Sequence, residues 1–284
     1  MPSQREIRRR IGSVRNIKQI TRAMQFVAAS KLKRAQEATL QARPYADALD
    51  EVLADVAQVL GGEEHPLLAR REEGTRLLVV MTTDRGLAGS LNTNTIRFTA
   101  QAITEQEGDL KVVTVGRKGQ GAMRRARVPI AATFEGFGDR PSFASVLALA
   151  RLITDDYLDG TYARVDLIYP RFVSTLTQRP VVDSLLPIDP SQDTHGIPGR
   201  QFLFEPNAGE VLTQILPRYV ATRIYQAVLE LTASEQSARM VAMKNATENA
   251  QELIDDLTLT YNKVRQANIT REMVEIATGA NAQT

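Results

Sequence analysis

The chain has 284 residues, of which 43% are apolar and 24% charged, a balance that is typical of a folded protein with a buried core and excludes a disordered segment. There is no cysteine, which excludes structural disulfides, thiol nucleophiles and cysteine-ligated metals. Apolar runs such as residues 77–81 are far shorter than the roughly 20 residues that span a bilayer, so we expect a soluble or peripheral protein without direct membrane insertion.

The net charge of +2 conceals a strong asymmetry along the chain. Residues 1–34 carry ten lysines or arginines and a single acid, Glu6, so this segment is +9 and the remainder is −7. A basic block of this size indicates an anionic partner, such as nucleic acid, lipid headgroups or an acidic protein surface. The plainer interpretation is a solvated helix face.

Residues 3–60 are predicted to form one long amphipathic helix. Ser3 and Glu6 form a capping-box pattern at its start, and Pro44 is expected to kink or interrupt it because proline has no amide donor. At 1.5 Å per residue the helix would be about 85 Å long. The apolar residues that recur at three- and four-residue steps, and form the predicted buried stripe, are Ile7, Ile11, Val14, Ile17, Ile20, Met24, Val27, Leu32 and Ala35.

Residues 76–205 are predicted to form a central domain of alternating strands and helices. The predicted strands are residues 77–82, 112–115 and 165–169, and the predicted helices are residues 92–107, 118–126 and 142–157. This order favours βαβ units around a mainly parallel, Rossmann-like sheet. Residues 173–186 could add an edge strand, and residues 187–199 are expected to form a loop.

The second long helix is predicted to begin at Asn207 and to continue without a stop signal to Gly279, with a bend near Pro217. It would be about 105 Å long. Two helices of this length cannot both lie on one compact core, and pairing with each other buries both apolar stripes. We therefore expect an α/β protein in which a long antiparallel coiled coil of residues 1–60 and 207–278, one discontinuous unit, carries the central domain.

Two glycine-containing loops follow predicted strands, at the place where doubly wound folds bind phosphates. Residues 83–89 have the sequence TDRGLAG and residues 116–121 have GRKGQG, and neither matches a Walker motif or the dinucleotide-binding order of glycines. Tight structural turns are the favoured interpretation of both loops. No cofactor is expected.

The remaining candidate side chains for catalysis or metal binding have no suitable neighbours in the sequence. His65 and His195 are isolated in predicted loops, without the partners that a metal site or a nucleophile with its base requires. The acid pairs at residues 155–156 and 255–256 fall inside helical patterns, where adjacent side chains point away from each other. We therefore expect no catalytic residue and no metal site.

Three long segments resemble the family of ATP synthase gamma subunits. Residues 11–34, IGSVRNIKQITRAMQFVAASKLKR, are similar to the family's N-terminal signature, and residues 83–92, TDRGLAGSLN, to its central loop. Residues 234–249, SEQSARMVAMKNATEN, and 261–275, YNKVRQANITREMVE, are similar to its C-terminal signature. The resemblance covers nearly the whole chain in the right order.

The resemblance implies a non-catalytic central-stalk rotor of a bacterial F-type ATP synthase. The two terminal helices would enter the ring of alpha and beta subunits, and the central domain would lie near the epsilon subunit and the c-subunit ring of the membrane rotor. The protein would be peripheral, at the cytoplasmic face of the inner membrane. The absence of a transit peptide favours a bacterial source.

The resemblance also implies contact residues. The positions that match contacts with loops of the beta subunit are Met24, Arg239, Arg265, Gln266, Thr270 and Glu272. The central loop would add partner contacts through Asp84, Arg85 and Gly86. Contact with the membrane ring maps to Phe204 and Glu205, where many relatives have tyrosine instead of phenylalanine.

Two other functions compete with the rotor interpretation. A nucleic-acid-binding protein would use the basic N-terminal arm, although the arm contains only one aromatic residue, Phe26, and its apolar stripe favours a protein partner. A nucleotide-dependent enzyme would use the loop at Asp84 and would hydrolyse ATP as an isolated chain. We expect neither DNA or RNA binding at physiological salt nor such hydrolysis.

Overall fold

The computed structural model describes residues 3–60, 65–71, 73–106, 108–189 and 208–281. These residues form two compact units. One unit contains Met1–Ala28 and Met240–Thr284, and the other contains Ala29–Arg239. The two longest helices, α1 (Gln4–Leu60) and α5 (Ala208–Asn281), contribute to both units. The predicted long terminal helices are thereby confirmed.

The Ala29–Arg239 unit is built on one five-stranded sheet with the order β3-β2-β1-β4-β5. Its strands are β1 (Arg76–Met81), β2 (Leu110–Val115), β3 (Ile130–Phe134), β4 (Arg164–Phe172) and β5 (Gln178–Leu186). The first four strands are parallel, and β5 pairs with β4 in the antiparallel direction. The predicted mainly parallel sheet is confirmed, whereas β3 was not predicted.

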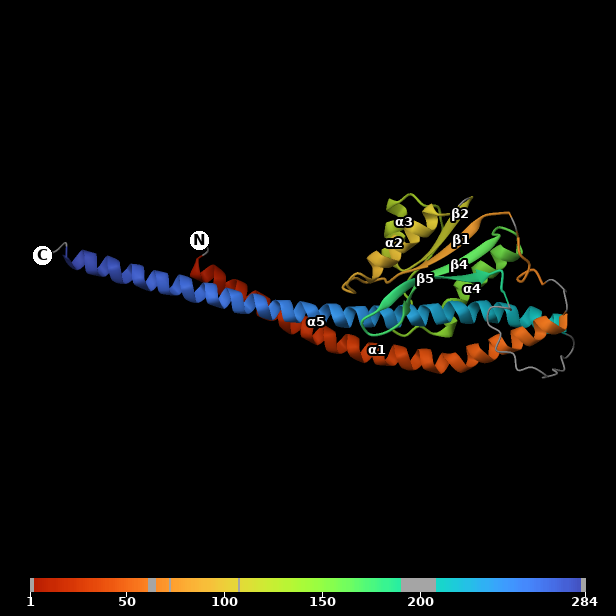
Figure 1. Cartoon of the computed structure of the whole chain (residues 1–284), viewed down its shortest axis with the longest axis horizontal. Helices are drawn as coiled ribbons and strands as arrows, with labels where there is room; N and C mark the ends of the chain where they lie inside the picture. The colour runs from red at the N-terminus through yellow and green to blue at the C-terminus, as the bar shows by residue number, and fades with distance from the viewer. Residues whose placement is uncertain (1–2, 61–64, 72, 107, 190–207, 282–284) are drawn as a thin grey trace. The chain divides into compact units, whose positions relative to one another are not determined.

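Helices cover both faces of this sheet, so it is buried between two apolar layers (Figure 1). On one face, Leu78 and Val80 pack with α2 (Leu91–Thr104) and α3 (Arg117–Arg125). On the other face, Leu77 and Val79 pack with α4 (Phe143–Leu158), α5 and the end of α1. The successive side chains of β1 thus enter two different cores, as the period of two in a strand requires.

Prolines do not interrupt the two long helices. Pro44 lies inside α1 and Pro217 inside α5, and both side chains are exposed. On the exposed side of a helix, the carbonyl that loses its amide donor can bond to water, so the loss is tolerated. The predicted interruption at Pro44 is therefore wrong. At the start of α1, the Ser3 hydroxyl accepts a hydrogen bond from the amide of Glu6 at 3.2 Å, which confirms the predicted cap.

In the first unit, the beginning of α1 pairs with α5 in the antiparallel direction. Gln4 donates to the Tyr261 hydroxyl at 3.1 Å, and the hydroxyls of Thr21 and Thr247 are 2.8 Å apart. Later residues of α1 thus contact earlier residues of α5, as expected for the predicted antiparallel coiled coil. An apolar cluster around Ile7, Ile11 and Ile254 lies at one end of this contact.

The buried side of α1 in this unit differs from the predicted stripe. Ile17, Ile20 and Val27 are 50%, 59% and 54% exposed, while the polar Thr21 is buried. The contacting residues follow a seven-residue repeat. At two positions this repeat places a polar residue in the contact, although the preceding residue in the sequence is an isoleucine. The residues of α1 on this seam are Ile7, Ile11, Val14, Lys18, Thr21 and Ala28.

Candidate partner-contact surfaces

The central loop, residues 83–89, is held in place by its acidic residue. The Asp84 carboxylate accepts hydrogen bonds from the backbone amides of Arg117, at 3.1 Å, and Gly136, at 3.0 Å. Asp84 therefore joins the loop after β1 to the segments that follow β2 and β3. The exposed large side chains of the loop are those of Arg85 and Leu87. Of the three predicted contact residues in this loop, Arg85 is the most accessible.

The glycines after β2 serve a close contact between strand and helix. Gly116 has φ 88°, and a Cβ there would lie 2.1 Å from the carbonyl oxygen of Thr82, so no other residue fits without a backbone shift. The amide of Lys118 donates to the Thr83 carbonyl at 3.2 Å, and that of Gly119 donates to the Thr82 hydroxyl at 2.7 Å. These amides at the start of α3 are thus bonded to protein groups. Both glycine loops are explained as structural turns, without a bound phosphate.

A polar cluster surrounds the predicted contact residue Arg239 on α5. Its guanidinium donates to the Glu235 carboxylate at 2.5 Å, to the side-chain oxygen of Gln236 at 3.1 Å and to the carbonyl of Gly86 at 3.3 Å. The Arg239 side chain is only 11% exposed. In the isolated chain Arg239 therefore contacts the central loop, and its direct contact with a partner subunit stays a prediction.

Asp139 connects this cluster to α1. Its carboxylate accepts from Lys31 of α1 at 2.6 Å and from the side-chain amide of Gln236 of α5 at 3.1 Å. Burial alone would raise the pKa of Asp139, but the hydrogen bond and charge of Lys31, together with two arginines, outweigh burial and lower it. The two long helices are thus joined through one carboxylate of the α/β domain.

Glu235 is in the opposite electrostatic situation. Burial raises the pKa of its carboxyl group, and the charge and hydrogen bond of Arg239 offset only part of that rise. The nearby carboxylates of Asp139 and Asp84 raise it further. The cluster therefore holds a buried acid whose charged form depends on its arginine partner.

The other predicted beta-subunit contacts lie in the first unit. Arg265, Gln266, Thr270 and Glu272 are exposed on α5, and Met24 is half-buried on α1. Nothing in these positions requires a role within the chain. Their assignment as contact residues stays a prediction.

Sequence reasoning missed a second feature of the same helix end. Ile269, Met273, Val274 and Ile276 are 47%, 67%, 57% and 73% exposed. Ile269, Met273 and Ile276 recur at four- and three-residue steps and so lie within about 60° of one another on the helix, and this spacing is the signal that could have identified them. Exposed apolar side chains close together on a surface often mark a contact with another protein.

Several candidate residues have no functional geometry or fall outside the description. Phe204, Glu205 and His195 lie outside the described residues. His65 accepts a hydrogen bond from the amide of Leu67 through Nδ1 at 3.2 Å, and burial lowers the pKa of its imidazole. His65 thus fixes a turn. Within the described ranges no three His, Asp or Glu side chains are grouped as a metal ion would require.

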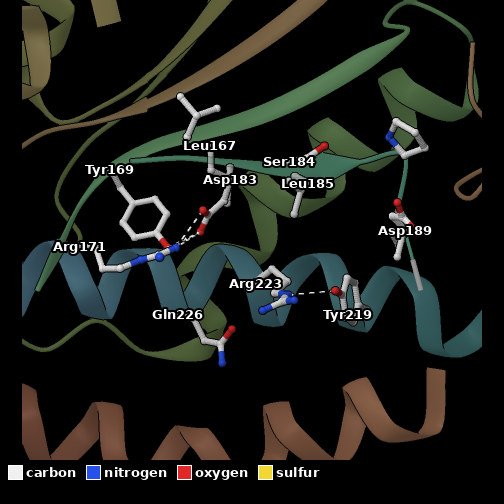
Figure 2. A pocket seen from close by; sticks show the side chains of 13 residues that line it. Leu167, Tyr169, Arg171, Asp183, Ser184, Leu185, Asp189, Tyr219, Arg223 and Gln226 are labelled. Atoms are coloured by element: carbon white, nitrogen blue, oxygen red, sulfur yellow. Dashed lines mark hydrogen bonds and ion pairs between the residues drawn. The ribbon is translucent and has the colours of Figure 1, made fainter. Parts of the chain in front are cut away.

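A polar pocket of about 290 Å³ lies between β4, β5 and α5 (Figure 2). Its main charged side chains are engaged: Arg171 donates to the Asp183 carboxylate at 2.8 Å, and Arg223 donates to the Tyr219 hydroxyl at 3.0 Å. The Tyr169 hydroxyl also donates to Asp183, at 2.5 Å. Burial, followed by the contact with Asp183, raises the pKa of Tyr169 far above its ordinary value. The pocket therefore presents paired groups, and its network anchors the edge strand.

Among the helices of the described part of the chain, none combines the length and the hydropathy needed to cross a membrane. The basic residues at the start of α1 are largely exposed, as on a solvated face. Arg22 lies over the Phe26 ring at 6.0 Å from its centre, and the Phe26 side chain is 62% exposed. This end of α1 thus combines positive charge with accessible apolar surface.

Comparisons with known proteins agree over the whole chain. A family model described as ATP synthase matches residues 3–283. The ATP synthase gamma chain of Pelotomaculum thermopropionicum is 46% identical over 282 residues, which cover 99% of both chains. The ATP synthase gamma chain of Chloroflexus aurantiacus is 47% identical over 290 residues, which cover 100% of both.

Solved structures give the same result. A chain of the central stalk and c-ring of the Tetrahymena thermophila mitochondrial ATP synthase matches with a TM-score of 0.64 and 26% identity, covering 80% of this chain and 99% of that chain. A chain of the Euglena gracilis mitochondrial ATP synthase matches with a TM-score of 0.69 at 20% identity, over 99% of this chain and 94% of that one, and supports the fold. The chain belongs to the family of ATP synthase gamma chains.

Proposed function

We propose that this chain is the rotating central shaft of an F-type ATP synthase and that it couples ion flow through a membrane rotor to ATP synthesis or hydrolysis. The observation that carries the proposal is the C-terminal part of α5, where every residue from 269 to 278 is exposed although four of the large ones are apolar. A helix of this kind is suited to contact with a surrounding ring of subunits. Full-length identity of 46–48% to gamma chains supports the assignment.

The shaft needs no catalytic side chain in this mechanism. Its surface is asymmetric, so each orientation favours a different conformation of each neighbouring catalytic subunit. Rotation then changes the nucleotide affinity of the three sites in turn, because the orientation of the shaft and the binding of nucleotide are thermodynamically linked. Hydrolysis and synthesis of ATP would take place on the alpha and beta subunits.

The contacts follow from the exposed surfaces. Met24, Arg265, Gln266, Thr270 and Glu272 would contact loops of the beta subunits. The positive charge of residues 1–34 would be attracted to acidic loops of the same subunits, with little directional preference, so it can retain the shaft without fixing one angle.

The central domain of residues 76–205 would serve the lower end of the shaft. We propose that it contacts the epsilon subunit and that Phe204 and Glu205 face the c-subunit ring. The central loop, through Arg85 in particular, would add a contact with the ring of alpha and beta subunits. The complex would lie at the cytoplasmic face of the inner membrane, with this chain as a peripheral component.

The test uses the assembled complex in vesicles. Replacing Arg265 and Gln266 together by alanine should weaken ATP-driven proton pumping while the chain still assembles, because only surface contacts are removed. Lys263→Ala is the matched control, since Lys263 is an exposed cation of the same helix, about 160° around the axis from Arg265. Full pumping by the double variant would exclude these contacts. Failure of the unaltered chain to assemble with alpha and beta subunits would exclude the function.

A further inference from the structure

One segment of α5 is buried by polar contacts instead of apolar ones. Between Leu212 and Leu231, α5 belongs to the main apolar core of its unit. Seven polar residues lie at positions 230–239, at the end of the same unit; the Thr232 hydroxyl bonds within its own helix, which leaves six. We call them the polar collar: Glu230, Ser234, Glu235, Gln236, Ser237 and Arg239. Ser234, Gln236 and Ser237 are 0%, 1% and 0% exposed.

The first side of the collar contacts the hairpin between β4 and β5, which lies against α5 (Figure 1). The Ser234 hydroxyl donates to the carbonyl of Pro170 at 2.8 Å, and the Ser237 hydroxyl donates to that of Thr175 at 2.7 Å. The Glu230 carboxylate accepts from the amide of Phe172 at 2.8 Å. Three helix positions thus bind the backbone of the hairpin directly.

The second side of the collar contacts two other loops of the α/β domain. Gln236 donates to Asp139, and Arg239 donates to the carbonyl of Gly86 and to Glu235. At about 100° per residue, Glu230, Ser234 and Ser237 lie within about 60° of one another on the helix, whereas the other three lie roughly 100–160° from Ser234. The α/β domain therefore binds this segment of α5 from opposite sides.

Hydrogen bonds of this kind fix the rotational angle of a helix more sharply than apolar contacts do. The hydrophobic effect has no direction, so an apolar interface can repack as a helix turns or slides. Hydrogen bonds weaken steeply as their angle departs from linearity, and a buried hydroxyl that loses its partner costs about 1–3 kcal/mol. A rotation of α5 against the α/β domain would break bonds on both sides of the collar together.

We propose that the polar collar sets the rotational angle of α5 relative to the α/β domain and transmits torque between them. This inference rests on the proposed function, because only a rotating shaft is loaded in torsion. The six residues act as positioning residues: they contact neither nucleotide nor ion, and they hold the helix at the angle at which its contact surface is useful. Alanine in place of either buried serine would keep the helix but would remove a hydrogen bond that fixes that angle.

The main test replaces both hydroxyls of the hairpin side, Ser234→Ala with Ser237→Ala, in the assembled complex. A probe attached to the α/β domain should show a broader distribution of angles during each pause of ATP-driven rotation, and proton pumping per ATP hydrolysed should fall. Thr232→Val is the matched control. Thr232 is also buried, at 4% exposure, but its hydroxyl donates to the Val228 carbonyl of its own helix at 2.8 Å, so its loss leaves the collar intact.

A covalent link gives an independent second measurement. The chain has no cysteine, so Thr175→Cys with Ser237→Cys introduces one possible disulfide within it, at the position of the hairpin contact. The reduced variant should show the broad distribution, and the oxidised variant should show a narrow one. This comparison uses a single folded protein in two states, so a defect in folding cannot produce the difference.

The outcomes separate the inference from the function on which it rests. Equal angular distributions and equal pumping for the double alanine variant and Thr232→Val would overturn the collar proposal, while rotation itself would still support the shaft. Identical behaviour of the oxidised and reduced cysteine variant, with the link verified by electrophoresis, would also overturn it. An unaltered complex that does not rotate would instead reject the proposed function.

Discussion

Two stretches of α5 have the same secondary structure and opposite surroundings. From Leu212 to Leu231 its apolar side chains are almost all in the core of the Ala29–Arg239 unit, whereas from residue 269 to 278 every side chain is exposed. The first stretch derives its stability from burial within the chain. The second cannot, so its exposed apolar residues are more useful to a partner than to the fold. One helix thus combines a structural segment with a segment that we propose contacts a partner.

The largest effect on stability is expected at the buried ion pair of the sheet. Asp166 is fully buried on β4 and accepts from Arg76 at 2.6 Å and from Arg164 at 3.0 Å. Asp166→Ala leaves the nearly buried Arg76 without its carboxylate, which should lower the free energy of unfolding by about 3–5 kcal/mol. Denaturant unfolding of the full-length chain measures it. Arg164→Ala, which removes a half-exposed partner, should cost much less, and equal losses would contradict the assignment.

A matched pair of substitutions tests the comparison within α5 directly. Ile224 is 0% exposed and Ile276 is 73% exposed, so the same change removes the same atoms from opposite environments. Ile224→Ala should destabilise the chain by about 2–4 kcal/mol through a cavity. Ile276→Ala should alter stability by less than about 0.5 kcal/mol. The measurement is again denaturant unfolding, and a similar loss for both would show that the helix end is buried within the chain.

A smaller effect is expected in the dependence of stability on pH. The folded-state pKa of Asp139 is lowered, so its carboxylate contributes stability at neutral pH, and this contribution is lost as the pH falls below about 4. Asp139→Asn should therefore lose less stability than the unaltered chain between about pH 6 and about pH 3. The folded-state pKa of Glu235 is raised, so its carboxyl group adds stability as the pH falls. Glu235→Gln should therefore lose more stability than the unaltered chain over the same pH range. Parallel curves for all three proteins would contradict the assigned shifts.

Much of the architecture could be predicted because local signals and the fold agree. Helix α4 lies within one residue of the predicted range 142–157, and the Ser142 hydroxyl caps its start by accepting from the amide of Ser145. Strand β3 was missed, since it is short and lies at the edge of the sheet, so its residues alternate between partial burial and exposure without a strong apolar run. Its role depends on pairing with β2, which no local pattern contains.

The candidate sites could be predicted less well, for a related reason. The seam of α1 includes Lys18 and Thr21, which reach Gln251 and Thr247 on the partner helix, and a search for apolar periods selects Ile17 and Ile20 instead. The segment around Arg239 was recognisable as a family signature, but nothing in its residue types indicates that the side chain turns inward. Contacts between distant segments decide these roles, and sequence spacing alone does not encode them.

The shared core of the Ala29–Arg239 unit also affects how the chain can fold during translation. Leu49 and Leu53, which precede the strands in the sequence, join the same apolar cluster as Leu212 and Leu216, which follow them. During translation the apolar face of the sheet is complete well before the helix that covers it has left the exit tunnel. We expect the nascent chain to require shielding by a chaperone until α5 emerges.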